Sequence, residues 1–153
     1  MSKTVEAATV PLAYPAVFKR EKSGAGYIVN FPDLPEALTG GENLEDALLE
    51  AADCLKCALS GRMIDKCEIP RPSRLRKGRH LVSVPLYIAP KVALYRAMRA
   101  QGITEAGLAK KLSVSETVVR RMLDPRHDTR PERIDAALRA LGKSMYVAVR
   151  DAA

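Results

Sequence analysis

Polar residues at helical spacing in the second half of the chain have the types and arrangement needed to recognise DNA bases. The segment 104–124 reads TEAGLAKKLSVSETVVRRMLD, and in a helix that starts after Ser115 its solvent-facing residues are Glu116, Thr117, Arg120 and Arg121. A small helix with this surface fits the major groove of B-DNA, where arginine makes a bidentate contact to guanine O6 and N7. Solvated arginines on an ordinary helical hairpin are the alternative interpretation.

Two short helices joined by a tight turn are predicted to position these side chains. Their inward positions are apolar, namely Leu108, Ala109, Leu112, Val118, Val119, Met122 and Leu123. Thr104 and Ser115 are expected to be the N-caps, and Ser113 occupies a turn position where a left-handed residue would cost about 1 kcal/mol. The pattern is typical of a helix-turn-helix, with predicted DNA contacts from Lys110, Lys111, Ser115, Glu116, Thr117, Arg120, Arg121 and Arg126.

Charge divides the chain into an acidic first part and a basic second part. Residues 1–70 hold seven basic and eleven acidic residues, a net charge of −4. Residues 71–90 hold five basic residues and no acid, and residues 91–153 hold thirteen basic and seven acidic residues, a net of +6. Two modules with different partners are therefore expected, and only the basic one suits a phosphate backbone.

The remaining pattern predicts an α+β protein with domains at residues 1–86 and 90–153. The first domain is expected to have the order βββαβ, with elements at Tyr14–Lys19, Gly26–Phe31, Ala37–Thr39, a helix from Asn43 that Gly61 closes, and His80–Val84. The run PDLP at residues 32–35 is expected to stop the second strand. The second domain is expected to have about four helices, including Lys91–Gln101 and one from Pro131 to Gly142, and a terminal strand at Ser144–Arg150.

Features of enzymes, metal sites and membrane spans are weak in this sequence. Cys54 and Cys57 lie inside the predicted helix, and with Cys67 they lack a fourth ligand, so free thiols and no metal or other cofactor are expected. His80 and His127 fall in different halves, and a two-metal nuclease would need several converging carboxylates. We expect no enzymatic activity. With no export signal and no apolar run of about 18 residues, a cytoplasmic protein is expected.

Several short motifs together resemble those of one known family. They are Tyr14-Pro-Ala-Val, Gly26-Tyr-Ile-Val, Phe31-Pro-Asp-Leu-Pro, Thr39-x-Gly41, Leu44-Glu-Asp-Ala, Val84-Pro-Leu, Ala93-Leu-Tyr-x-Ala-Met-Arg and Val114-Ser-Glu-Thr-Val-Val-Arg-Arg. In these motifs the chain resembles HicB-type antitoxins of toxin–antitoxin pairs, in the variant with a C-terminal helix-turn-helix. Glu36-Ala37 stands where the family commonly has Gly-Cys.

The resemblance implies a fold, two partners and a function. The first domain would be a truncated ribonuclease-H-like fold that binds and covers a HicA-type ribonuclease toxin, with contacts expected from Tyr27, Phe31, Asp33 and Glu36. The second domain would bind the promoter DNA of its own operon, as a homodimer or higher oligomer, because one recognition helix reads few bases. The alternative is a stand-alone transcriptional regulator whose first domain senses a small molecule or serves in oligomerisation.

Overall fold

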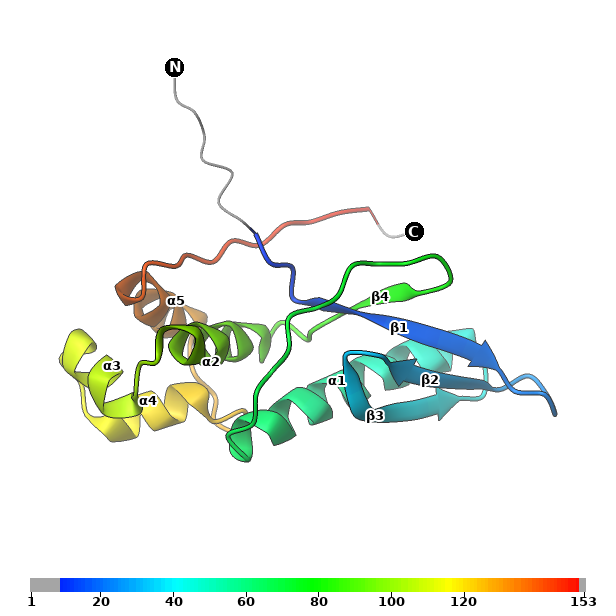
Figure 1. Ribbon diagram of the computed structural model, residues 1–153, viewed down its shortest axis with the longest axis horizontal. Coiled ribbons are helices and arrows are strands. Elements are labelled where there is room, and N and C mark those ends of the chain that lie inside the picture. Colours follow the sequence, from blue (N-terminus) through cyan, green and yellow to red (C-terminus); the bar gives the residue numbers. More distant parts are fainter. Residues whose placement is uncertain (1–8, 152–153) are drawn as a thin grey trace, which may run out of the picture. The chain divides into compact units, whose positions relative to one another are not determined.

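A computed structural model describes residues 9–151, which form four strands and five helices (Figure 1). The strands are β1 (Ala13–Arg20), β2 (Tyr27–Phe31), β3 (Leu34–Gly41) and β4 (His80–Ser83). The helices are α1 (Leu44–Ile64), α2 (Ala89–Gln101), α3 (Glu105–Leu112), α4 (Glu116–Leu123) and α5 (Pro131–Ala140). The predicted α+β class and the order βββαβ of the first half are confirmed.

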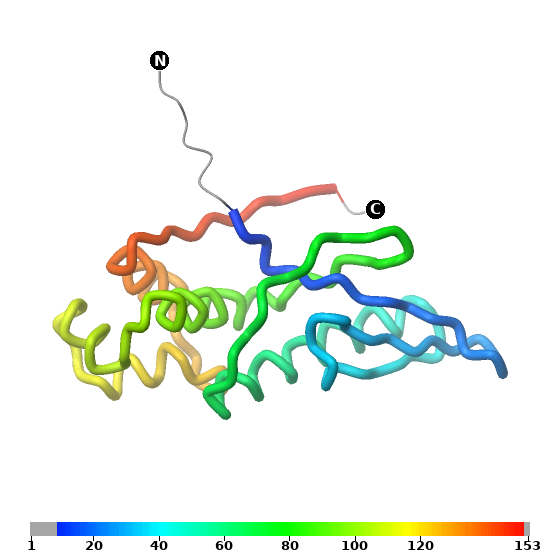
Figure 2. Tube along the Cα trace, in the orientation of Figure 1, coloured from blue at the N-terminus to red at the C-terminus, as the bar shows by residue number. Residues whose placement is uncertain are grey.

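The four strands form one antiparallel sheet in the order β3-β2-β1-β4. Alternation along the strands directs one set of apolar side chains, including Val29 and Phe31, towards α1, whose Ala47, Ala51 and Leu55 are fully buried. Both the ribbon and the tube show α1 running along this sheet (Figures 1 and 2). The core of the first half therefore lies between one face of the sheet and one helix.

Strand β3 is longer than predicted and contains a proline. It begins at Leu34, immediately after a tight turn, and includes Pro35, whereas the prediction had this strand begin at Ala37; β2 ends at Phe31, as the run PDLP predicted. β3 is an edge strand, so the missing N–H of Pro35 removes no bond that a neighbour needs. A register shift between Asn30 and Phe31 accommodates the extra residues.

The turn into α1 depends on Gly41, part of the Thr39-x-Gly41 motif. A Cβ atom at Gly41 would lie 2.6 Å from the Cα of Ala47, which is closer than real atoms approach. The side chain of Asn43 accepts a hydrogen bond from the N–H of Asp46, and Asp46 accepts one from the N–H of Glu42. Asn43 thus caps the helix, while Asp46 accepts from the residue before that cap, and the absence of a side chain at Gly41 lets the helix start against the sheet.

The predicted end of α1 at Gly61 was wrong. The helix continues through Gly61 to Ile64 and ends where Lys66 adopts a left-handed conformation with φ of 55°. A glycine inside a helix costs about 1 kcal/mol relative to alanine. Burial of Leu59 and Met63, on either side of Gly61, offsets that cost.

The chain divides into two compact units that are not simple halves of the sequence. The first contains the residues up to 58 and 70–85, and the second contains 59–69 and those from 86 onward. Within the second unit, Tyr95 Oη donates to the carbonyl of Cys67 at 2.6 Å, and Arg99 donates to that of Lys66 at 3.1 Å. A single cut near residue 86 would therefore separate residues 59–69 from a helix to which they are hydrogen-bonded.

The second unit is a cluster of four helices around one apolar core. Its buried members are Leu94, Ala97, Met98, Leu108, Ala109, Val119, Met122, Ile134, Ala137, Leu138 and Leu141. They come from α2, α3, α4 and α5 and from the residue that follows α5. The predicted number of helices in this part is confirmed.

The predicted terminal strand at Ser144–Arg150 was wrong. These residues follow α5 as extended chain without strand pairing, and the pairs among the described residues all lie within 13–83 (Figure 2). Alternating side chains favour a strand only where another backbone supplies the hydrogen bonds. Val149 is 96% exposed, so its side chain packs on no neighbour.

Candidate nucleic-acid interface and partner surface

Helices α3 and α4 begin at the two predicted capping residues. Thr104 Oγ1 accepts a hydrogen bond from the N–H of Gly107 at 3.0 Å, and Ser115 Oγ accepts one from the N–H of Val118 at 3.4 Å. Each hydroxyl satisfies an amide that has no partner inside its helix. The start of α4, and with it the rotation of its side chains, is therefore set locally by Ser115.

A strained serine joins the two helices. Ser113 has φ of 55° and ψ of 43°, the left-handed conformation expected at this turn. Its amide donates to the carbonyl of Lys110, and the next amide, from Val114, donates to that of Ala109 at 3.0 Å. These bonds close α3 in the way that glycine usually does, at a cost of about 1 kcal/mol for a residue with a Cβ.

Helix α4 has one buried side and one exposed side. Val119 and Met122 are buried, whereas Val118 and Leu123, also predicted to face inward, are only partly buried. The predicted DNA-contacting residues are all exposed: Lys110, Lys111, Ser115, Glu116, Thr117, Arg120, Arg121 and Arg126. The structure thus brings four of them onto one surface of a single eight-residue helix.

Carboxylates of the chain already neutralise two of these arginines. Arg120 pairs with Glu105 of α3 and with Glu116 of α4, both at 3.1 Å. Arg126 pairs with Asp124 at 2.9 Å, and the hydrogen bonds from Arg126 hold the pKa of the Asp124 carboxyl below its usual value. Arg120 therefore links α3 to α4, whereas Arg121 has no carboxylate partner among the described residues.

A buried lysine, absent from the sequence predictions, holds the end of α4. Lys91 of α2 is 2% exposed, and its Nζ donates to the carbonyls of Arg121 and Met122 and to Thr129 Oγ1 at 2.9, 3.2 and 3.0 Å. Burial lowers the pKa of Lys91, although Asp124 and Asp128 act in the opposite direction. Lys91 precedes Leu94, Tyr95 and Met98 by three, four and seven positions, so helical spacing already placed it on the buried side.

The four predicted partner-binding residues of the first unit differ in accessibility. Phe31 is 1% exposed, so its side chain fills the core and is not presented to a partner, which corrects the prediction. Glu36 is exposed, while Tyr27 is half-buried beside the guanidinium of Arg20. Asp33 accepts a hydrogen bond from the N–H of Ser73 at 2.9 Å, which ties the basic segment after α1 to the β2–β3 turn.

An acidic groove lies near the start of α1, and its lining contains none of those four residues. It has a volume of about 570 Å³ and is lined by Glu21, Ser23, Gly24, Ala25, Gly26, Gly40, Gly41, Glu42, Asp46 and Glu50. Four carboxylates line a surface whose glycines leave room for another chain to approach. Glycine pairs flanked by acids at 21–26 and 40–42 were the available signal in the sequence.

Comparison with known proteins gives the family. A sequence model described as "HicB_like antitoxin of bacterial toxin-antitoxin system" matches residues 13–93. The chain belongs to the HicB-like antitoxin family. It is 40% identical over 134 residues to Antitoxin HicB 2 of Photorhabdus laumondii, across 88% of this chain and 94% of that protein. It is 35% identical over 134 residues to Antitoxin HicB of Escherichia coli K12, across 88% and 96% of the two chains.

The three cysteines of this HicB-like antitoxin lie in and just after α1. Cys54 and Cys57 are in α1, Cys67 follows that helix, and all three are free thiols. Within residues 9–151, no group of three or more histidine, cysteine or acidic side chains is arranged to hold a metal ion.

None of the described helices of this antitoxin is long and apolar enough to cross a membrane.

Proposed function

We propose that this HicB-like antitoxin binds and neutralises a HicA-type ribonuclease toxin through its first unit and represses its own operon through its second. In this proposal α3 and α4 form a helix-turn-helix, and the βββαβ unit is the truncated ribonuclease-H-like domain that the family resemblance implies. The chain catalyses no reaction of its own and acts in the cytoplasm. The observation that carries the DNA-binding part is the position of Arg121, exposed on α4 without a carboxylate partner among the described residues.

Helix α4 is the proposed recognition helix. Its length of eight residues and its capped N-terminus suit insertion into the major groove, which leaves Thr117 and Arg121 able to reach base edges. Glu116 can accept from cytosine only when its ion pair with Arg120 opens. Lys110, Lys111 and Arg126 are assigned to the phosphate backbone, and Ser115 to a position close to it.

Charge supports the assignment of the toxin to the first unit. A toxin that binds RNA needs a basic surface, and complementary charge both accelerates association and selects the partner. The exposed Glu36, the half-buried Asp33 and the acidic groove at Glu42 and Glu50 provide charge of opposite sign, and Tyr27 adjoins the groove residue Gly26 in the sequence. We assign these residues to toxin binding.

The DNA-binding proposal also implies an oligomeric state. One recognition helix reads few bases, so a homodimer that binds two half-sites is the proposed functional form. The full-length protein should accordingly sediment as a dimer or higher oligomer at the concentration where it binds its promoter. A monomer on DNA would contradict this.

The DNA-binding part is tested with three variants that each remove one arginine. Arg121→Ala should lose affinity for the promoter duplex by about tenfold or more per half-site beyond any loss on random duplex, because a base-reading arginine contributes about 1–3 kcal/mol. Arg126→Ala should weaken both duplexes alike and reduce the salt dependence. Arg139→Ala, at an exposed arginine paired with Asp135 on α5, is the control for loss of one charge. Equal losses on both duplexes for Arg121→Ala would contradict base reading.

The toxin-binding part is tested by reversing charge in the acidic groove. The double variant Glu42→Lys and Glu50→Lys should weaken binding to the toxin encoded beside it, measured by titration calorimetry, and should fail to restore growth on co-expression. Glu45→Lys, an exposed acid of the same helix outside the groove, is the control and should behave as the parent. If the neighbouring gene encodes no protein that binds the parent chain, while promoter binding persists, the stand-alone regulator replaces the antitoxin.

A further inference from the structure

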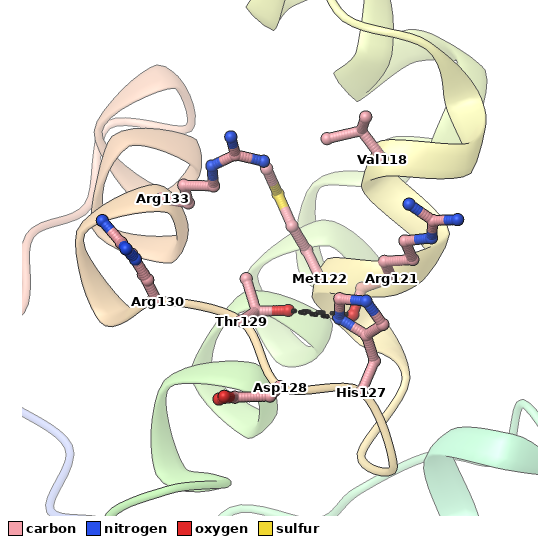
Figure 3. A pocket seen from close by; sticks show the side chains of 8 residues that line it. All are labelled: Val118, Arg121, Met122, His127, Asp128, Thr129, Arg130 and Arg133. Atoms are coloured by element: carbon pink, nitrogen blue, oxygen red, sulfur yellow. Dashed lines mark hydrogen bonds between the residues drawn. The ribbon is translucent and has the colours of Figure 1, made fainter.

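A basic pocket lies beside the proposed recognition helix in the second unit. It has a volume of about 490 Å³ and is lined by Val118, Arg121, Met122, His127, Asp128, Thr129, Arg130 and Arg133. These residues come from α4, from the loop after it and from the first turns of α5 (Figure 3). Figure 3 shows Arg133 and Arg121 on opposite sides of the pocket, with Met122 and Thr129 between them.

Ion pairing separates the arginines of this region into two groups. Residues 116–139 contain six arginines, and three of them pair with carboxylates: Arg120, Arg126 and Arg139. The other three, Arg121, Arg130 and Arg133, have no carboxylate partner among the described residues, and all three line this pocket. Positive charge that the fold leaves uncompensated is therefore concentrated at one place.

The floor of the pocket is held by hydrogen bonds among Lys91, Thr129, His127 and the backbone of Arg121. Thr129 Oγ1 accepts from Lys91 Nζ at 3.0 Å and donates its one proton to the carbonyl of Arg121 at 3.2 Å. His127 Nδ1, at 3.1 Å from the same oxygen, must then be the donor of that hydrogen bond. Asp128 is the one acid in the lining, and Figure 3 shows its carboxylate directed away from Arg121 and His127.

The start of α5 adds a favourable electrostatic field. Arg130 is its N-cap residue and makes no side-chain capping bond, and Pro131 follows at the first position of the helix. The N-terminus of a helix attracts anions through its dipole, although Pro131 has no N–H to donate and Glu132 is an acid in this first turn. Three guanidinium groups and a helix N-terminus at one pocket suit an anion with several acceptor oxygens, such as a phosphate.

We infer that this pocket binds a phosphate group of the DNA backbone that flanks the major-groove segment contacted by α4. The inference rests on the proposed DNA-binding function and extends the interface to Arg130 and Arg133, which had no assigned role. A backbone phosphate is favoured over a free phosphate compound because Arg121 belongs both to the exposed side of α4 and to the pocket. One anion in the pocket therefore lies beside the residues that would contact bases.

The test measures binding of the full-length protein to its promoter duplex and to a random duplex at several salt concentrations. The double variant Arg130→Ala and Arg133→Ala should weaken binding to both duplexes by a similar factor, about tenfold or more at moderate salt. The slope of log K against log salt should fall by about one for each phosphate that the variant no longer neutralises. Arg139→Ala removes an arginine of the same helix that lies outside the pocket and has no assigned DNA contact, and it should leave affinity and slope unchanged.

Substitution of single promoter phosphates by uncharged methylphosphonates identifies the phosphate that the pocket holds. Substitution at one position should weaken DNA binding by the parent protein and leave DNA binding by the double variant unchanged. Titration with inorganic phosphate and with a mononucleotide tests whether the pocket instead binds a free phosphate compound. If either binds at micromolar concentration and displaces DNA, the backbone assignment is overturned. Unchanged DNA affinity and slope in the double variant would overturn it too. If the parent protein binds its promoter no more tightly than random duplex, the proposed function itself is contradicted, independently of the pocket.

Discussion

The ammonium group of Lys91 donates to the backbone carbonyl of Arg121 at 2.9 Å, so a buried cation in one helix supports the exposed arginine of another. The last carbonyls of α4 have no partner within their own helix, and Lys91 donates hydrogen bonds to two of them. Its positive charge also interacts favourably with the negative end of the helix dipole. Through Thr129 it also fixes the loop that leads to α5. The position of Arg121 thus depends on a lysine that lies in the core, beneath the exposed surface of α4.

Replacing Lys91 by methionine should destabilise the fold. Methionine fills a similar volume but leaves the carbonyls of Arg121 and Met122 buried without a donor, at a cost of about 1–3 kcal/mol for each such group. We expect the free energy of unfolding to fall by about 2–4 kcal/mol in urea titrations. Lys111→Met, at an exposed position, is the control and should change stability by less than about 0.5 kcal/mol.

The same lysine should make stability depend on pH in the alkaline range. Burial lowers its pKa in the folded state, so between that pKa and the ordinary value of about 10.4 the unfolded chain holds more protons. Stability then rises with pH as the solution passes the folded pKa, and this gain ends near the unfolded value. The difference in unfolding free energy between the parent and Lys91→Met should therefore increase as the pH rises from the lowered pKa of the folded state towards the ordinary value of about 10.4. A decrease in this difference would mean that the nearby acids outweigh burial and raise the pKa of Lys91 in the folded state.

Ser113→Gly should stabilise the turn between α3 and α4. Glycine removes the strain of a left-handed serine, about 1 kcal/mol. It also raises the conformational entropy of the unfolded chain, which lowers stability by a smaller amount. A net gain of about 0.5 kcal/mol is expected, measured as a rise in thermal midpoint. Gly102→Ala is the converse control, because Gly102 has φ of 63° and open space around it, so the strain of the new Cβ should lower stability by about 1 kcal/mol.

Gly41→Ala should disrupt the start of α1, whereas Gly61→Ala should strengthen the same helix. A Cβ at Gly41 would overlap the backbone of Ala47, so strand or helix must move, and a loss of about 2 kcal/mol or more is expected. Gly61 lies inside α1 with nothing within 4 Å of the position that a Cβ would take, so alanine should add about 0.5–1 kcal/mol. Opposite shifts of the urea midpoint would verify both; a tolerated Gly41→Ala would contradict the close approach of the two backbones.

The helix caps and the turn of the second unit depend on neighbouring residues, so the sequence was sufficient to predict them. The caps at Thr104 and Ser115 and the strained Ser113 follow from residue type and spacing, and the structure contains each of them. The failures need information from elsewhere in the chain. Pro35 is tolerated because its strand is at an edge, and Gly61 is tolerated because its neighbours are buried.

The basic pocket likewise could not be predicted from the sequence. Arg121, Arg130 and Arg133 are separated by up to twelve residues, and the sequence does not say which arginines their own chain neutralises. Only the folded arrangement shows that Arg120 and Arg126 are paired while the other three converge. The sequence prediction assigned Arg120, Arg121 and Arg126 to DNA and did not include Arg130 or Arg133.

The thiols of α1 should differ in reactivity although they are three residues apart. Cys54 is partly buried, and this burial, followed by the negative charges of Cys57, Asp53 and other nearby acids, raises the pKa of its thiol. Cys57 is exposed. Because the thiolate is the reactive form, iodoacetamide at about pH 8 should modify Cys57 several times faster than Cys54, as followed by peptide mass spectrometry over time. In urea the two rates should converge, since the difference comes from the fold; equal rates in the native protein would show that Cys54 is accessible and its burial unimportant.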